Sequence, residues 1–118
     1  SPSRGLGDVY KRQVPHRARQ MTRDDYLYFD YLIGMDSANI RNMTRIAGGT
    51  DSQDKIYKML SFAGYEDTQK FTGVRDVADP WYTGNFDETY EDVVAGCKGF
   101  LYYLQQKGDI SKEIEIPR

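Results

Sequence analysis

Tyr31-Leu32-Ile33-Gly34-Met35-Asp36-Ser37 is the stretch of sequence that decides the fold. Its apolar residues form one continuous run that ends abruptly at Asp36, without alternation between apolar and polar positions. Such a run is typical of a strand covered on both faces, as in a parallel sheet that lies between helices. The sequence therefore predicts a strand from Tyr31 to Met35 in an α/β domain.

Helical patterns flank this strand. Before it, Thr22 and Asp25 have the spacing of a capping box, which predicts a short helix over residues 23–29. After it, two sets of apolar residues keep helical spacing, and each set ends at a glycine: first Ile40, Met43 and Ala47, then Ile56, Met59, Leu60 and Ala63. We therefore expect two helices to follow the first strand.

The second strand is expected at Phe71 to Val77, where Gly73 weakens the pattern. It leads into Asp79-Pro80, where proline prevents further ladder pairing. Two strands make a very small sheet, because sheets of this class usually have about four to six strands. Either the domain has further strands that the sequence pattern does not show, or part of the domain lies outside the chain.

The last helix has the clearest pattern in the sequence. Asn85 is a suitable cap, with Glu88 three residues later. One apolar stripe then continues at helical spacing through Phe86, Tyr90, Val93, Val94, Cys97, Phe100, Leu101 and Leu104. Residues 108–118 alternate charged and apolar side chains, and we interpret them as a C-terminal tail that is either a frayed end or a weak edge strand.

Composition excludes several classes of function. The 118 residues include 16 Lys+Arg and 18 Asp+Glu, and a net charge of -2 gives no field that attracts nucleic acid or an anionic membrane. No apolar run approaches the roughly 18 residues of a membrane span. One Cys and one His permit no disulfide framework and too few ligands for a zinc site. We expect a cytoplasmic domain with no metal, nucleic-acid or membrane partner.

Candidate chemistry follows the second predicted strand, at Asp79-Pro80-Trp81-Tyr82. Ligands of open α/β sheets gather at the carboxyl ends of the strands, and a carboxyl group beside two aromatic rings suits proton transfer to an aromatic substrate. The same residues also suit a plain turn with a lid on the core. Asp36 has two interpretations as well, and the N-cap of the next helix is favoured over a catalytic role.

Three blocks together resemble the later part of the low-molecular-weight protein-tyrosine phosphatases. They are His16 to Gln20, Phe29 to Asn39, and Asp79 to Tyr82 followed by Phe86 and the last helix. Their order and spacing match the family over residues 14 to about 107. The resemblance implies a flavodoxin-like, three-layer α/β domain with a parallel sheet. It also implies hydrolysis of phosphotyrosine, in a protein or a small aryl phosphate, without a metal or other cofactor.

Site roles come from the same resemblance. In this family a Cys thiolate attacks phosphorus, an Asp protonates the departing phenolate, and water then releases the cysteinyl phosphate. Asp79 matches the general acid, and Trp81 and Tyr82 match the aromatic wall that holds the substrate ring. His16 matches a residue that supports the phosphate-binding loop.

The sequence departs from the family at the nucleophile. Members carry near the N-terminus a loop of Cys, five residues and Arg, whereas here Tyr103 stands six residues after Cys97. Cys97 lies in the apolar stripe, where a thiol is normally a small buried hydrophobe. Residues 1–13 have no apolar period and resemble a non-native leader. We therefore expect an N-terminally truncated domain over residues 14–107 that is inactive by itself.

Three other functions remain open. An arsenate reductase of similar fold needs additional thiols, and the sequence has none besides Cys97. A non-catalytic flavodoxin-like module of the receiver type could accept phosphate on Asp36, but this leaves the Asp79 to Tyr82 segment without a role. A nucleic-acid patch at Arg17, Arg19 and Arg23 is disfavoured because acidic residues adjoin it.

Overall fold

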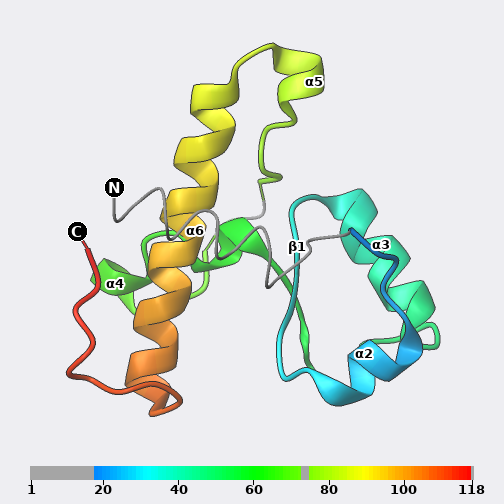
Figure 1. Ribbon diagram of the computed structural model, residues 1–118, viewed down its shortest axis with the longest axis horizontal. Helices are drawn as coiled ribbons and strands as arrows, with labels where there is room; N and C mark the ends of the chain where they lie inside the picture. The colour runs from blue at the N-terminus through cyan, green and yellow to red at the C-terminus, as the bar shows by residue number, and fades with distance from the viewer. Residues whose placement is uncertain (1–17, 73–74, 118) are drawn as a thin grey trace, which may run out of the picture.

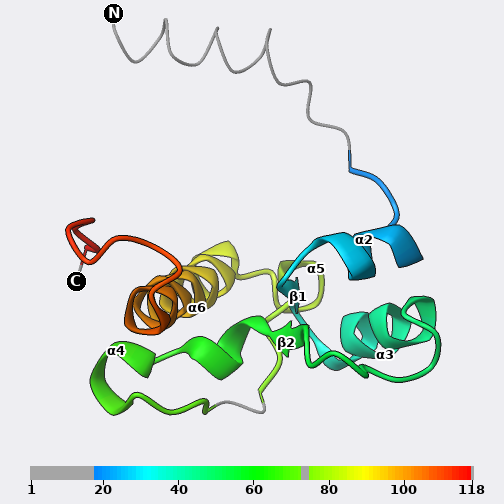
Figure 2. The same cartoon turned by 90° about the horizontal axis from the view of Figure 1, so that it is seen from below.

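Two parallel strands lie between two groups of helices in the computed structural model, which describes residues 18–72 and 75–117 (Figure 1). β1 (Leu32–Gly34) pairs with β2 (Ile56–Lys58). Helix α6 (Phe86–Lys107) covers one side, and α2 (Arg23–Tyr28) and α3 (Ser37–Ile46) cover the other, as Figure 2 also shows. The predicted layered α/β arrangement with a parallel sheet is confirmed.

The predicted helix starts are confirmed at their caps. Thr22 and Asp25 form the capping box of α2, in which the Asp25 carboxylate accepts from the Thr22 N–H at 2.8 Å. Asp36 caps α3 and Asn85 caps α6, and each side-chain oxygen accepts from the backbone N–H three residues on. These bonds satisfy donors at helix ends that have no partner within the helix.

The predicted helix from Ile56 to Ala63 is wrong. Its first residues form β2, and the next form a 3₁₀ helix, η1 (Met59–Phe62), with a one-turn helix α4 (Tyr65–Thr68) after it. The Asp51 carboxylate accepts from the backbone N–H groups of Lys55 and Ile56, which fixes the extended entry into β2. Pairing with β1 therefore overrides the helical spacing of the apolar side chains.

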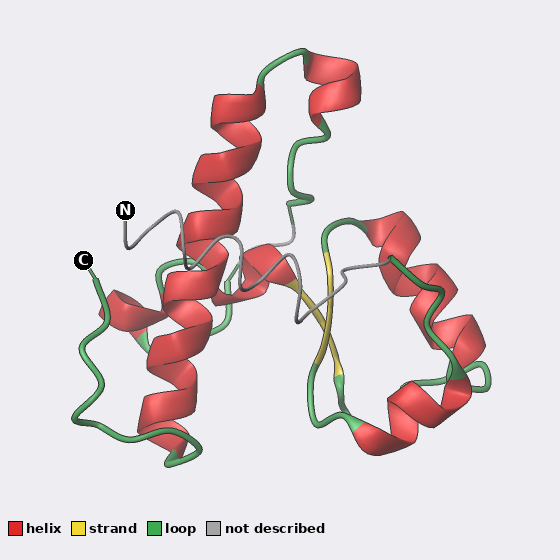
Figure 3. Cartoon of the chain, in the orientation of Figure 1, coloured by secondary structure: helices red, strands yellow, loops and turns green. Residues whose placement is uncertain are grey.

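The predicted strand from Phe71 to Val77 is also wrong. None of its described residues is in a strand, and Gly73 and Val74 lie outside the described residues (Figure 3). Isolated bonds hold the segment instead, since the Thr72 N–H donates to the Ser61 carbonyl at 2.9 Å and the Val77 N–H donates to the Met35 carbonyl at 2.8 Å. Val77 is buried with Met59 and Leu60 in the core.

Helix α6 contacts η1 through its glycines. A Cβ on Gly99 would collide with the backbone carbonyl of Phe62, and a Cβ on Gly96 would lie 2.5 Å from the Met59 side chain. Phe62 is fully buried, and its ring lies at the centre of a group of aromatic side chains. The other rings within reach of it belong to Tyr57, Phe71, Phe100 and Tyr103. The close approach of two backbones is thus what joins α6 to the rest of the domain.

Replacement of Gly99 by Ala is expected to lower the free energy of unfolding by about 1–3 kcal/mol, because the new methyl group overpacks a rigid backbone contact. Urea unfolding of the variant measures this. Glu91→Ala, at an exposed position of the same helix, is the control and is expected to change stability by less than about 0.5 kcal/mol. A Gly to Ala substitution at an exposed helix position raises stability. A Gly99→Ala variant more stable than the parent would therefore show that Gly99 does not pack against the Phe62 backbone.

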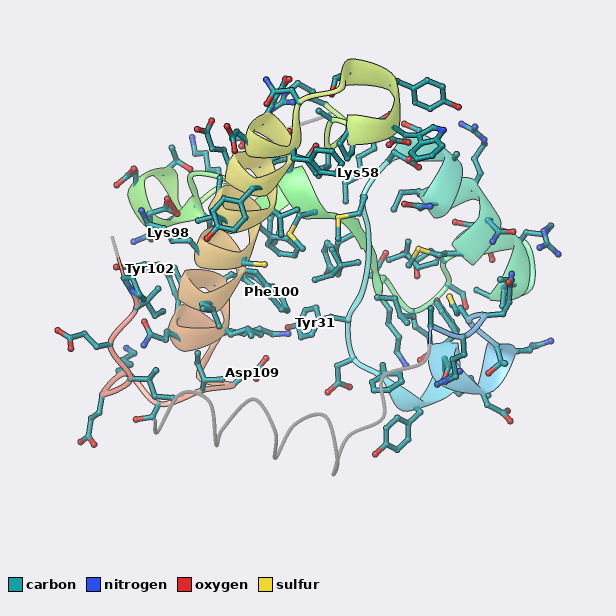
Figure 4. All side chains as sticks on the ribbon, turned by 45° about the horizontal axis from the view of Figure 1, so that its top comes forward. Tyr31, Lys58, Lys98, Phe100, Tyr102 and Asp109 are labelled. Carbon is teal, nitrogen blue, oxygen red and sulfur yellow. The ribbon has the colours of Figure 1, made fainter. Side chains whose placement is uncertain are left out.

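Tyr31 connects the start of β1 to the end of α6. Its ring lies 5.2 Å from that of Phe100, and its hydroxyl accepts from Lys107 Nζ at 2.7 Å and donates to Asp109 at 3.2 Å (Figure 4). Burial raises the pKa of Tyr31 to about 12, although Lys107 opposes this shift. The tail after Gly108 forms no strand in its described residues, and of these Ile116 returns to a buried position.

The prediction that Cys97 is buried is wrong, because its side chain is exposed. The buried residues of α6 are Asp92, Gly96 and Gly99. The glycine contact with η1 thus decides which face of α6 is covered, and part of the apolar stripe remains in solvent. Its exposed members are Phe86, Tyr90, Val94, Cys97 and Leu101.

Candidate functional site

A cavity of about 310 Å³ lies at the carboxyl end of β1. It is lined by residues from the end of the strand, from the following irregular segment and from the first turns of α6, among them Met35, Asp36, Val77, Asp79, Thr89 and Val93. A larger cavity of about 510 Å³, beside Arg19 and Met43, contains none of the predicted site residues. Of the predicted site residues, Asp79 therefore lies in a cavity at the end of a parallel strand, the place where α/β domains bind ligands.

Asp79 lines this cavity and begins the short helix α5 (Pro80–Thr83). Its Oδ1 accepts from the Trp81 N–H at 2.9 Å, which leaves Oδ2 without a role in the cap. Pro80 restricts the preceding residue to extended backbone, and Asp79 has φ −87° and ψ 113°. Asp79 is exposed to solvent.

Trp81 and Tyr82 both project from α5 into solvent, with 87% and 86% of their surfaces exposed. Gly84 ends this helix at φ 69°, a left-handed conformation that favours glycine. The interpretation of these rings as a lid on the core is thereby wrong. Two adjacent exposed aromatic rings instead provide flat apolar surface beside the Asp79 carboxyl group.

Asp36 acts as the cap of α3, as the sequence predicted. Its carboxylate accepts from the Asn39 N–H at 2.7 Å, and the Asn39 side chain in turn accepts from the Met35 N–H at 3.0 Å. The end of β1 and the start of α3 are thus fixed to each other. Asp36 and Asp79 therefore each cap a helix with one carboxylate oxygen, and Asp79 is the more exposed of the two.

Arg75 and Asp92 are functional-site neighbours that the sequence analysis missed. The guanidinium of Arg75 donates to both oxygens of Asp92, at 3.0 and 2.6 Å, and Asp92 also accepts from the Ala78 N–H at 3.2 Å. Arg75 holds the pKa of the buried Asp92 carboxyl below its ordinary value. This stabilisation is present above the ordinary carboxyl pKa and is lost as the pH falls through the lowered one. An acidic side chain on the packed side of α6 was the available signal.

Asp76 joins the same segment to the sheet and to α3. Lys58, the last residue of β2, contacts its Oδ1 at 2.7 Å, and the backbone N–H and hydroxyl of Ser37 both donate to that atom at 3.0 Å. Lys58 is the main cause that lowers the pKa of Asp76. The residues before Asp79 are therefore attached to β2, α3 and α6.

Cys97 does not join the cavity that Asp79 lines. It lies 11 residues into α6, about 16 Å along the helix axis from its start, in a groove with Val94, Leu101 and Ile116. His16, predicted to support a phosphate loop, lies outside the described residues. Within residues 18–72 and 75–117, no three His, Cys, Asp or Glu side chains are grouped to hold a metal ion. No helix in that part of the chain is long and apolar enough to span a membrane.

Comparisons with known proteins agree on one family. The family model described as "Low molecular weight phosphotyrosine protein phosphatase" matches residues 10–110. Low molecular weight protein-tyrosine-phosphatase PtpA of Staphylococcus epidermidis is 31% identical over 93% of this chain and 75% of its own length. YfkJ of Bacillus subtilis, of the same description, is 36% identical over 76% of this chain.

The solved structure of YfkJ has the same fold as this chain. The two superpose with a TM-score of 0.66 and 32% sequence identity, over 87% of this chain and 63% of that structure. In sequence, the match spans 53% of YfkJ. The flavodoxin-like α/β class is therefore correct, and the chain covers little more than half of this relative.

Proposed function

We propose that this chain, which belongs to the low molecular weight phosphotyrosine protein phosphatase family, carries the general-acid segment of an enzyme that hydrolyses phosphotyrosine. One observation carries the proposal. Asp79 lines a cavity at the carboxyl end of β1 and is followed, after Pro80, by the two exposed aromatic residues Trp81 and Tyr82. The names of the relatives, which are protein-tyrosine phosphatases, support the same substrate class.

The proposed reaction needs a proton donor for a chemical reason. The phenol of tyrosine has a pKa of about 10, so its anion is a poor leaving group at neutral pH. As a thiolate attacks phosphorus and the P–O bond breaks, Asp79 gives its proton to the phenolate oxygen. Water then attacks the cysteinyl phosphate, returns a proton to Asp79 and releases inorganic phosphate and the thiolate.

Trp81 and Tyr82 are proposed to hold the ring of the phosphotyrosine or small aryl phosphate. Flat aromatic surfaces bind such a ring by stacking or edge contacts, which are worth about 0.5–1.5 kcal/mol beyond the area buried. His16 is proposed to support the phosphate loop. No residue in this scheme needs a metal or another cofactor. A cytoplasmic location is also part of the proposal, because the single cysteine of the chain permits no disulfide framework.

The nucleophile is proposed to come from sequence upstream of Val14. Residues 14–107 are then the later part of the phosphatase domain, residues 108–118 its tail, and residues 1–13 a leader foreign to it. The sequence holds no Cys with Arg six residues later. A loop of that form binds the phosphate through its backbone N–H groups and lowers the pKa of the thiol.

The genomic DNA upstream of the Val14 codon tests this proposal. We expect an in-frame Cys-x5-Arg loop preceded by an apolar strand, and we expect the complete protein to release phosphate from phosphotyrosine and from aryl phosphates. A complete reading frame without that loop, or a complete protein that hydrolyses no aryl phosphate, would exclude the phosphatase function. Labelling of Asp36 by acetyl phosphate would favour the receiver-type module instead.

A further inference from the structure

We propose that Thr89 and Asp92 are positioning residues that hold the Asp79 carboxyl group in place through the backbone N–H and C=O groups of Ala78. This inference rests on the proposed function of Asp79 as the general acid. Thr89 Oγ1 donates to the Ala78 carbonyl at 2.6 Å, and the Asp92 carboxylate accepts from the Ala78 N–H at 3.2 Å. Both polar groups of the residue before Asp79 are thus bound by side chains of α6.

The spacing on α6 makes this arrangement possible. Thr89 and Asp92 are three residues apart, so they lie on the same face of the helix, one turn from each other. Asp92 is only 8% exposed and Thr89 is partly buried. The two bonds hold the two successive peptide units on either side of the Ala78 Cα atom, so the position and orientation of Ala78 are fixed better than by one bond. The direction in which Asp79 leaves Ala78 is therefore set by α6.

The Arg75 contact explains why a buried carboxylate is tolerated here. A buried carboxylate without a partner would be strongly destabilising, whereas the two hydrogen bonds from the Arg75 guanidinium compensate for its lost hydration. The Arg75 side chain is itself 60% exposed, so only one partner loses its hydration. We therefore regard Arg75 as the counter-charge of Asp92, and Asp92 as the group that contacts the acid segment.

The remaining freedom of Asp79 is small once Ala78 is held. Pro80 limits the backbone of Asp79, and the Trp81 N–H holds its Oδ1. General acid catalysis requires hydrogen-bond reach to the leaving oxygen, and a misplacement of about 1 Å is enough to cost on the order of 10²-fold in rate. A change at Thr89 or Asp92 should consequently affect the protonation of the leaving group more than any other step.

The experiment compares two substrates in the complete protein. Phenyl phosphate has a poor leaving group that needs the acid, and 4-nitrophenyl phosphate has a good one that depends on it less. Thr89→Val and Asp92→Leu, which remove the hydroxyl donor and the carboxylate acceptor, are expected to lower kcat/KM for phenyl phosphate roughly tenfold, and for 4-nitrophenyl phosphate less than about twofold. Thr89→Ser keeps the hydroxyl and is expected to restore the parent ratio. Glu91→Gln, an exposed carboxyl on the same helix, is the control.

A second measurement follows hydrogen exchange at the Ala78 amide. Asp92→Leu, which removes the acceptor of the Ala78 N–H, is expected to speed this exchange roughly tenfold without changing the amides within α6. Because Asp92→Leu leaves the Arg75 guanidinium without its partner, the double variant Arg75→Gln with Asp92→Leu is measured alongside it. This arm needs no catalysis, so it decides the anchoring of Ala78 even if the phosphatase proposal fails.

The outcomes separate the two proposals. If Asp79→Asn changes the ratio between the two substrates and neither Thr89→Val nor Asp92→Leu does, the positioning role is wrong and the phosphatase function stands. If Ala78 exchanges at the same rate in all variants, the anchoring itself is wrong. If Asp79→Asn has no selective effect while Ala78 exchange responds as expected, the assigned acid is wrong and the anchoring alone stands.

Discussion

Replacement of Asp79 by Asn in the complete protein is expected to lower kcat/KM for phenyl phosphate by about 10²–10³-fold, which is the usual contribution of a positioned general acid. The loss for 4-nitrophenyl phosphate is expected to be much smaller, below about tenfold, because nitrophenolate departs without full protonation. Asn is chosen because it still accepts from the Trp81 N–H and so keeps the cap of α5. The substitution therefore removes a proton and little else.

Asp36→Asn is the matched control for this variant. Asp36 lines the same cavity and is also a helix cap, and Asn replaces it in that role at little cost in stability. We expect the ratio of the kcat/KM values for the two substrates to stay at the parent level in Asp36→Asn. A loss of kcat/KM confined to phenyl phosphate in Asp36→Asn, together with an equal loss for both substrates in Asp79→Asn, would mean that Asp36 is the general acid and Asp79 is not.

The parts of the fold that depend on neighbouring residues could be predicted from the sequence. Thr22, Asp36 and Asn85 each satisfy an N–H group three residues away, so their short side chains and spacing contain the needed information. Strand β1 was predictable for a similar reason. The residues of β1 are apolar on both faces because helices cover both.

The errors arose where distant residues decide the structure. Ile56 has a helical pattern around it, yet it pairs with Leu32, 24 residues earlier, and no local pattern contains that pairing. The exposure of Cys97 follows from the contact of Gly99 with Phe62, which again joins segments far apart in the chain. Sequence periodicity shows which residues share one face of a helix or strand. It does not show which of these faces packs against another part of the chain.

The candidate site shows the same division. Asp79, Trp81 and Tyr82 lie within four consecutive residues. The turn-forming pair Asp79-Pro80 and the two aromatic residues directly after it were visible in the sequence. Asp92 was not recognised, because its meaning depends on Arg75 and Ala78, which are 17 and 14 residues away and contact it only in the fold. A charged residue on the packed side of a helix is the sign to look for in such cases.

The rate of phosphate release from aryl phosphates is expected to be on the order of 10⁶-fold lower for the 118-residue chain by itself than for the complete protein. Removal of a nucleophile lowers kcat by a similar factor in other enzymes. The sole thiol of the chain, Cys97, lies on the middle turns of α6, where backbone N–H groups bond within the helix and none is free to bind phosphate. Six residues later stands Tyr103, which is no substitute for a phosphate-binding Arg.

Phosphate release from 4-nitrophenyl phosphate by the purified chain, by the Cys97→Ser variant and by the complete protein measures this difference. Cys97→Ser is expected to leave the activity of the chain and of the complete protein unchanged, because Cys97 lies within α6, in a groove with Val94, Lys98 and Leu101 and outside the cavity that Asp79 lines. Circular dichroism of the chain is recorded in the same buffer, so that loss of fold is distinguished from loss of chemistry. Activity of the folded chain that Cys97→Ser abolishes would make Cys97 the nucleophile, and the proposal of an upstream loop would then be wrong.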